Sequence, residues 1–225
     1  MEWVKLSHTQ LQHLCDCLKT NTSLQTLTLV GLSCSDCGDQ CRNCLDLSAL
    51  TQLQTLDLAS LPVTRLSLGS SKLESVELVS LSKLETAGSV LTSLIQSPGL
   101  RKLEVTHCSL SPGDVSTLVN ILPKLPQLEG LWLWGIDLGD QEVITTSNMS
   151  QLRCIVLASV TMSASSWRQF IQTLPRPSHQ LLVTLYDCNV DKETKTEVCS
   201  SPGYKVTHSD DTDLDFLTVP QTISD

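Results

Sequence analysis

Four cysteines near the start of the chain have a spacing that could bind a metal ion. The stretch SCSDCGDQCRNC contains two CxxC pairs, made by Cys34, Cys37, Cys41 and Cys44. CxxC pairs are the usual half-sites for zinc, and in ordinary zinc modules about 12–20 residues separate the halves so that the chain can turn around the ion. Here only GDQ separates the pairs, so a shared tetrahedral site would be strained. We therefore predict no metal site and no cofactor.

Buried thiols are the interpretation that we prefer for these cysteines. Cys34 is the eleventh residue of LQTLTLVGLSC, a segment from Leu24 whose pattern recurs along the chain, as described below. A buried apolar side chain is usual at that position. Gly38, Asp39 and Asn43 favour turns. We expect a loop in place of a helix, with cysteines that partly fill the space beneath it. One or two disulfides and a strained metal site stay as alternatives.

The remaining reactive side chains form no catalytic constellation. The sequence has no GxxxxGK(S/T), GxGxxG, GxSxG or HExxH motif for nucleotide binding or hydrolysis. Its histidines are scattered over different units, and His107 falls on a rim position where a solvated side chain is expected. We predict that the protein is not an enzyme.

Charge and hydropathy exclude several kinds of partner. The 225-residue chain has a formal net charge of −9, which disfavours binding along a phosphate backbone, so we expect no nucleic-acid partner. No apolar run reaches the roughly 20 residues of a membrane span, and the N-terminus is too polar for a signal peptide. The ten cysteines are spread through a Leu-rich chain. We therefore expect no membrane partner, reduced thiols and a cytoplasmic location.

Six segments follow one pattern, LxxLxLxx(N/C)xL or a close variant. They are LQTLTLVGLSC from Leu24, LQTLDLASLPV from Leu53, LRKLEVTHCSL from Leu100, LEGLWLWGIDL from Leu128, LRCIVLASVTM from Leu152 and QLLVTLYDCNV from Gln180. Their starts lie 29, 47, 28, 24 and 28 residues apart. Within the longest gap, VTRLSL (63–68) and LESVEL (73–78) predict two extra strands joined by tight turns, with no helix between them. Such a period indicates strand-plus-helix units that bury their apolar faces by stacking.

Helices are predicted between the strands from apolar residues at i, i+3, i+4 and i+7. The stripes are Leu11/Leu14/Cys15/Leu18, Val115/Leu118/Val119/Leu122 and Trp167/Phe170/Ile171/Leu174. Ser111, Pro112 and Asp114 provide an N-cap, a proline in the first turn and an acid at the third helical position, and Ser163 can cap the helix that carries Trp167. After residue 190 the sequence becomes polar, acidic and aperiodic, which predicts a largely disordered tail over 191–225.

The repeated pattern resembles the leucine-rich repeat of the ribonuclease-inhibitor-like class, over nearly all of residues 1–190. Cys108 and Cys188 stand at the ninth position, where that motif has a buried Asn or Cys. The resemblance implies an α/β solenoid of about nine strands in a curved right-handed arc, with its first unit truncated. A parallel sheet would line the concave face, and helices and loops would lie on the convex face.

The block from residue 30 to 68 also resembles units in the repeat domains of NOD-like-receptor-type (STAND) innate immune proteins of invertebrates. This resemblance implies a ligand-sensing or autoinhibitory module of a signalling protein, with signalling domains upstream of this chain. One alternative is the substrate-recruiting part of a ubiquitin ligase adaptor. Another is an extracellular receptor fragment, for which glycans on Asn21 or Asn148 would be evidence.

The predicted ligand-binding residues are those on the concave face. Side chains alternate along a strand, so the third, fifth and seventh positions of each unit point away from the core. From these positions we select Trp132, Trp134, Tyr186, Glu104, Lys102, Thr106 and Asp57. We expect a protein or another macromolecule to bind there, with Trp132 and Trp134 as its anchor because aromatic residues dominate binding energies.

Overall fold

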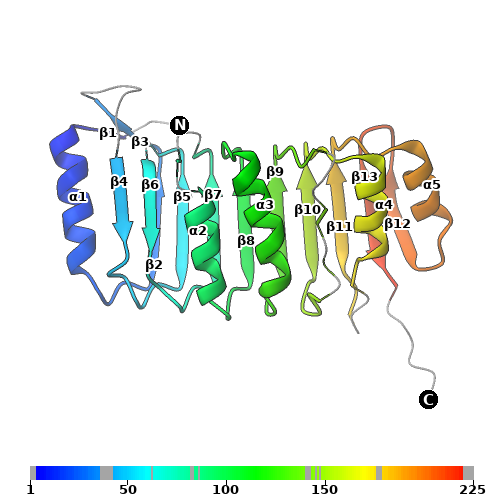
Figure 1. Cartoon of the computed structure of the whole chain (residues 1–225), viewed down its shortest axis with the longest axis horizontal. Coiled ribbons are helices and arrows are strands. Elements are labelled where there is room, and N and C mark those ends of the chain that lie inside the picture. Colours follow the sequence, from blue (N-terminus) through cyan, green and yellow to red (C-terminus); the bar gives the residue numbers. More distant parts are fainter. Residues whose placement is uncertain are drawn as a thin grey trace, which may run out of the picture.

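The computed structural model places a large, mostly parallel sheet against a layer of helices (Figure 1). The structure describes residues 4–35, 43–61, 63–81, 84–85, 87–139, 143–144, 146, 148–175 and 179–219. Cys37, Cys41 and the last six residues of the predicted tail lie outside this set.

Nine strands form the main sheet in the order β12-β13-β11-β10-β9-β8-β7-β5-β2. The parallel members are β2 (Thr26–Val30), β5 (Thr55–Ala59), β7 (Ser75–Val79), β8 (Lys102–Thr106), β9 (Gly130–Trp134), β10 (Cys154–Ala158) and β11 (Leu182–Tyr186). They pair without a shift in register, so equivalent positions lie side by side across the sheet. Within each strand the second and fourth residues point toward the helices, as for Leu56 and Leu58, which are fully buried. This alternation confirms the period that the sequence predicts.

Each of these parallel strands is followed directly by a residue with left-handed backbone conformation. Gly31, Ser60, Ser80, His107, Gly135, Ser159 and Asp187 have φ between 47° and 69° and directly follow β2, β5, β7, β8, β9, β10 and β11. Except for Asp187, whose N–H donates to Asp213 Oδ1 at 3.1 Å, their N–H groups donate to the last carbonyl of the neighbouring strand, for example Ser60 N to Val79 O at 2.9 Å. The recurrence means that every unit leaves the sheet by the same backbone turn.

Helices lie along one face of the main sheet, as Figure 1 shows. They are α1 (His8–Thr20), α2 (Ala87–Ser93), α3 (Pro112–Ile121), α4 (Ala164–Gln172) and α5 (Lys192–Ser200), with short 3-10 turns η2 (Leu94–Gln96) and η3 (Leu122–Lys124). The predicted caps are confirmed. Ser111 and Asp114 form a capping box at α3, and the Ser163 side chain accepts the Ser166 N–H at α4. Asp114 also accepts the Gly88 N–H at 2.6 Å and so joins α3 to α2.

The cysteine-rich segment leads into a strand instead of a loop, which differs from the prediction. β4 (Asn43–Leu47) pairs in parallel with β6 (Val63–Leu68) to form a separate two-stranded sheet. Figure 1 places this pair in front of the main sheet, in the layer that the helices occupy elsewhere. The extra strand predicted at 63–68 therefore exists but does not join the main sheet, where β5 pairs directly with β7. A second two-stranded sheet joins β1 (Val4–Leu6) to β3 (Leu32–Cys34) in parallel.

The prediction of a largely disordered tail is wrong for residues 191–219. Asp191 caps α5, and β12 (Tyr204–Ser209) and β13 (Leu214–Thr218) then form an antiparallel hairpin that pairs through β13 with β11. Leu214 and Phe216 are fully buried, and Phe216 packs edge-on against Tyr204 with ring centroids 5.2 Å apart. Burial of these few apolar side chains against the last parallel strand stabilises a segment whose composition is otherwise polar.

Candidate binding face

The main sheet has one face that the helices leave uncovered, and we call it the open face. On the seven parallel strands and β13 its central row of aligned residues comprises Thr28, Asp57, Glu77, Glu104, Trp132, Val156, Thr184 and Asp215. Neighbouring strands lie about 4.8 Å apart, so side chains that are far apart in the sequence become neighbours here. The register places the predicted concave-face residues of β8 and β9 side by side, while Asp57 lies two strands from Glu104 and Tyr186 lies two strands from Trp134.

Three carboxylates stand next to one another in the central row. Asp57, Glu77 and Glu104 occupy adjacent strands. Partial burial raises the pKa of Asp57 above its ordinary value, and repulsion from Glu77 and Glu104 raises it further. Among the residues that the structure describes, Asp57 has no hydrogen-bond or ion-pair partner. The row therefore concentrates negative charge that the protein only partly compensates.

Lys102 is the cation that lies among these carboxylates. Its ammonium pairs with Glu77 and, at 3.4 Å, with Glu104. Burial alone would lower the pKa of Lys102, but the hydrogen bond and the attraction to Glu77, together with the attraction to Glu104, raise it. The ammonium is thus held in its charged form. One ammonium against three carboxylates leaves two negative charges in excess on β5, β7 and β8.

Trp132 lies flat along its own strand beside Lys102. The Lys102 Nζ is 5.0 Å from the centre of the indole, a distance at which a cation is attracted to the ring face. The indole covers Gly130, where a Cβ would come within 2.3 Å of two of its ring atoms. A side chain at position 130 would therefore displace Trp132. The structure uses glycine there because the indole approaches the backbone so closely.

Trp134 and Tyr186 are the most exposed aromatic side chains of the open face, at 40% and 52%. Trp134 packs against the His107 ring with centroids 4.9 Å apart. Ala158, which is only 5% exposed, separates Trp134 from Tyr186 in the row at the strand ends. Two large aromatic side chains thus flank a small one. Large amphipathic rings in such a position are typical anchors of protein interfaces.

The structure changes the predicted residue set in two ways. Thr106 is only 6% exposed, and its hydroxyl donates to Glu104 Oε1 at 3.2 Å, so it positions Glu104 instead of facing a ligand. Glu77 was missed, although it lies between Asp57 and Glu104. The sequence could have indicated Glu77, because it is the fifth residue of LESVEL, and Asp57 and Glu104 are the fifth residues of their own segments.

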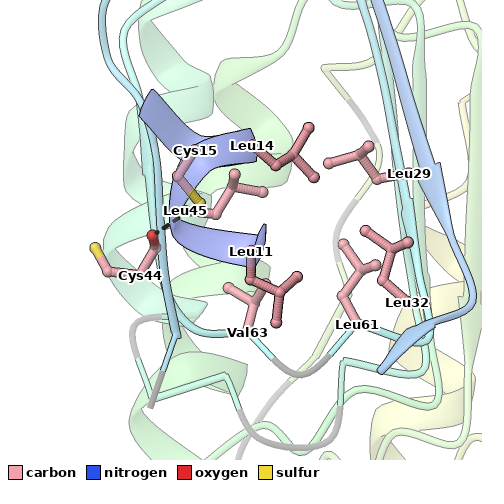
Figure 2. Close-up of a pocket in the computed structure, with 9 residues that line it drawn as sticks. All are labelled: Leu11, Leu14, Cys15, Leu29, Leu32, Cys44, Leu45, Leu61 and Val63. Atoms are coloured by element: carbon pink, nitrogen blue, oxygen red, sulfur yellow. Dashed lines mark hydrogen bonds between the residues drawn. The ribbon is translucent and has the colours of Figure 1, made fainter. Parts of the chain in front are cut away.

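Two cysteines near the start of the chain, Cys15 and Cys44, line an apolar cavity of about 30 Å³. Figure 2 shows this cavity between α1 and the strands, with Leu11 and Leu14 on one side and Leu29 and Leu32 on the other. Its lining is apolar, so the cavity is a packing gap that would stay dry. Cys44 does not fill it with its thiol, because that side chain is exposed and its sulfur points away (Figure 2).

Cys15 of α1 is the second cysteine that lines the cavity. Its Sγ lies 3.6 Å from the Cys44 carbonyl oxygen, and burial raises the pKa of the thiol. Cys34 is half-buried at the end of β3. The expectation that the cysteines fill the space beneath the segment therefore fails for Cys44, whose position in the β4–β6 sheet turns the side chain outward. The predictions for Cys37 and Cys41 lie outside the described residues.

The predicted ninth-position cysteines are buried, as expected. The Cys108 Sγ lies 3.3 Å from the Leu78 carbonyl and the Cys188 Sγ lies 3.3 Å from the Leu157 carbonyl, in each case on the preceding parallel strand. Burial raises the pKa of Cys188 to about 11. Both thiols are therefore unreactive links between units.

Two other sets of polar residues carry weaker arguments for a ligand. His208, Asp210 and Asp213 gather at the turn between β12 and β13 and are ligand types for a cation. However, Asp210 already accepts the N–H groups of Thr212 and Asp213, which lower its pKa to about 2, and Asp213 accepts the Asp187 N–H. A depression of about 280 Å³ lies at the N-terminal ends of the parallel strands and is lined by Gln54, Lys72, Glu74, Gly99, Arg101 and Gln127. Its mixed charges favour no ligand class.

No protein-family model and no curated protein matches this chain. Within the part of the chain that the structure describes, no helix is long and apolar enough to cross a membrane.

Proposed function

We propose that this chain is a leucine-rich-repeat solenoid whose open face binds a protein ligand and which performs no catalysis of its own. The observation that carries the proposal is the open face itself. Its residues come from successive units in one register, and Trp134 and Tyr186 are exposed on it. The left-handed residue after each of the seven parallel strands described in the main sheet supports the repeat assignment, because these units make the same turn.

The cellular role follows from the sequence resemblance alone. We propose that the module senses a ligand, or holds its protein inactive, within an innate immune signalling protein of the NOD-like-receptor type. A solenoid suits this role because its units present an extended surface without a preformed pocket. Recognition then depends on side chains of the open face, which vary from unit to unit while the buried positions stay aliphatic.

Site-specific photo-crosslinking tests where a partner binds. A benzoylphenylalanine at Val156, which is half-exposed on β10, should capture protein from an extract of the source cells. The same residue at Gln169, which is exposed on α4, is the matched control. Crosslinks from position 156 that disappear when Trp134 is replaced by alanine would support the proposal. Crosslinks of equal yield from both positions, or from neither, would contradict it.

A further inference from the structure

We propose that the occupant of the open face is an extended cationic segment of a protein, in which arginine side chains pair with Asp57 and Glu104 and stack on Trp134. This inference rests on the proposed function, because it names the chemistry of the ligand for the same face. It is carried by charge complementarity and by the position of the aromatic rings relative to the carboxylates.

The first step is the uncompensated charge. Lys102 pairs with Glu77 and Glu104, so its single charge is already shared between two carboxylates. Asp57 is in addition repelled by both glutamates. A cation placed against Asp57 would relieve this repulsion. An anionic partner such as a nucleic acid or a phospholipid headgroup would add to it.

The second step is the kind of cation. A guanidinium is planar, forms paired hydrogen bonds with carboxylates and stacks on aromatic faces, whereas an ammonium acts as a compact, strongly hydrated point charge. The open face offers both kinds of contact close together, since Trp134 is opposite Thr106 across the β8–β9 pair and Glu104 lies two residues before Thr106 on the same face of β8. The chain itself already places a cation, Lys102, beside the neighbouring indole of Trp132. Arginine therefore fits this face better than lysine.

The third step is the shape of the ligand. The row from Asp57 to Trp132 crosses three strand spacings, which is about 14 Å. An extended peptide rises about 3.3 Å per residue, so a segment of about five residues spans the row. A flat sheet face of this kind admits an extended chain that crosses the strands. A wholly apolar helix would instead bury the carboxylates without partners, at a high cost in free energy.

The charge of the chain argues against a second copy as the occupant. The protein carries a net charge of −9, so two copies repel one another at neutral pH. The described C-terminal hairpin is also committed elsewhere, because β13 pairs with β11 at the end of the sheet. A cationic partner from another protein is the remaining choice.

Fluorescence anisotropy with a labelled peptide of alternating arginine and serine tests the inference, with lysine–serine and glutamate–serine peptides for comparison. The measurement uses the full chain at about 50 mM salt, where screening is weak. The wild type should bind the arginine peptide most tightly and the glutamate peptide least. Asp57→Asn with Glu104→Gln should weaken binding of the arginine peptide about tenfold, since the variant removes both carboxylates with which the arginine side chains would pair.

A matched variant separates a specific site from diffuse attraction. Glu85→Gln with Glu197→Gln removes the same charge from exposed positions outside the open face, and should leave binding within about twofold of wild type. Trp134→Leu should reduce the preference for arginine over lysine. Equal losses for both charge variants, or an arginine preference that survives Trp134→Leu, would overturn the inference.

The outcome also separates this inference from the proposed function. If position 156 crosslinks to a partner while the arginine peptide does not bind, the cationic ligand is wrong and the recognition face stands. If crosslinking and peptide binding both fail, both proposals are wrong. Isolation from position 156 of a partner segment without basic residues would likewise overturn the cationic ligand alone.

Discussion

Replacing the tryptophans of the open face should cost much less stability than replacing the tryptophan of the core. Trp134 is 40% exposed and contacts His107, and Trp132 is half-exposed beside Lys102. Trp167 is fully buried in α4, packs edge-on against Phe170, and its Nε1–H donates to Asn189 Oδ1 at 2.8 Å. The three side chains are the same size but occupy two different environments.

The contacts set the expected free energies of unfolding. Trp134→Ala loses a ring pair worth about 0.5–1.5 kcal/mol, and Trp132→Ala loses a cation–ring contact worth about 0.5–1 kcal/mol. The double variant should therefore be destabilised by about 1–2.5 kcal/mol, the sum of these contacts. Trp167→Ala leaves a cavity that costs about 3–5 kcal/mol, and it also removes the bond to Asn189, worth about 1 kcal/mol.

Urea unfolding followed by far-ultraviolet circular dichroism measures these differences without relying on indole fluorescence. Trp167→Phe is the fallback if Trp167→Ala does not fold, because it keeps most of the volume and loses the hydrogen bond with part of the ring. It should fall between wild type and the alanine variant. A loss for Trp132→Ala with Trp134→Ala as large as that for Trp167→Ala would place the indoles in the core and refute the open face.

Two further substitutions test the charge of the open face and the C-terminal hairpin. Burial and then repulsion from Glu77 and Glu104 raise the pKa of Asp57. Asp57 therefore binds a proton more readily in the folded chain than in the unfolded chain. The free energy of unfolding should fall as the pH rises from the unfolded pKa of about 3.9 through the raised folded pKa. Asp57→Asn should therefore raise the free energy of unfolding by roughly 0.2–1 kcal/mol at pH 7 and give no such gain at pH 3, as measured by thermal melts; the same gain at both pH values would contradict the assignment. Phe216→Ala should lower the free energy of unfolding in urea by about 3–5 kcal/mol, because the Phe216 ring is fully buried against Tyr204. Val219→Ala, at a 41% exposed position, is the control. A loss below about 1 kcal/mol for Phe216→Ala would mean that the hairpin does not cap the sheet.

The parallel strands and the capped helices could be predicted because their signals are local and repeated. Alternating aliphatic residues identify each strand, and the side-chain period of two then fixes which residues reach the open face. Ser111 and Asp114 mark the start of α3 by residue types that satisfy its first N–H groups. The same signals predicted Asp57, Glu104 and Trp134 on one face. The register between strands, which makes the carboxylates adjacent, emerges only from the structure.

The C-terminal hairpin could not be predicted from composition. Asp210, Asp211, Asp213 and Asp215 give the segment a disordered appearance. Its stability comes instead from Leu214 and Phe216, which are two apolar residues at strand spacing. So short an alternation becomes informative only when a sheet edge is available to bury it. Here β11 provides that edge, since β13 pairs with it in antiparallel orientation.

The position of β6 explains why the open face is acidic. β5 and β7 are parallel neighbours, and a parallel pair needs a connection that returns the chain to the starting edge, usually of a dozen or more residues. Residues 60–74 make that return, with β6 as an extended strand in the layer that a helix fills elsewhere. The sequence pattern identifies β6 as a strand, because its side chains alternate between the two faces whichever sheet it joins. The pattern does not show that β6 lies in the helix layer, because that position depends on its pairing with β4. Had β6 entered the main sheet, a residue of that strand, such as Arg65, would have separated Asp57 from Glu77. Its place beside β4 instead keeps Arg65 out of the main sheet and leaves Asp57 and Glu77 as direct neighbours, which is the arrangement from which we propose a cationic ligand.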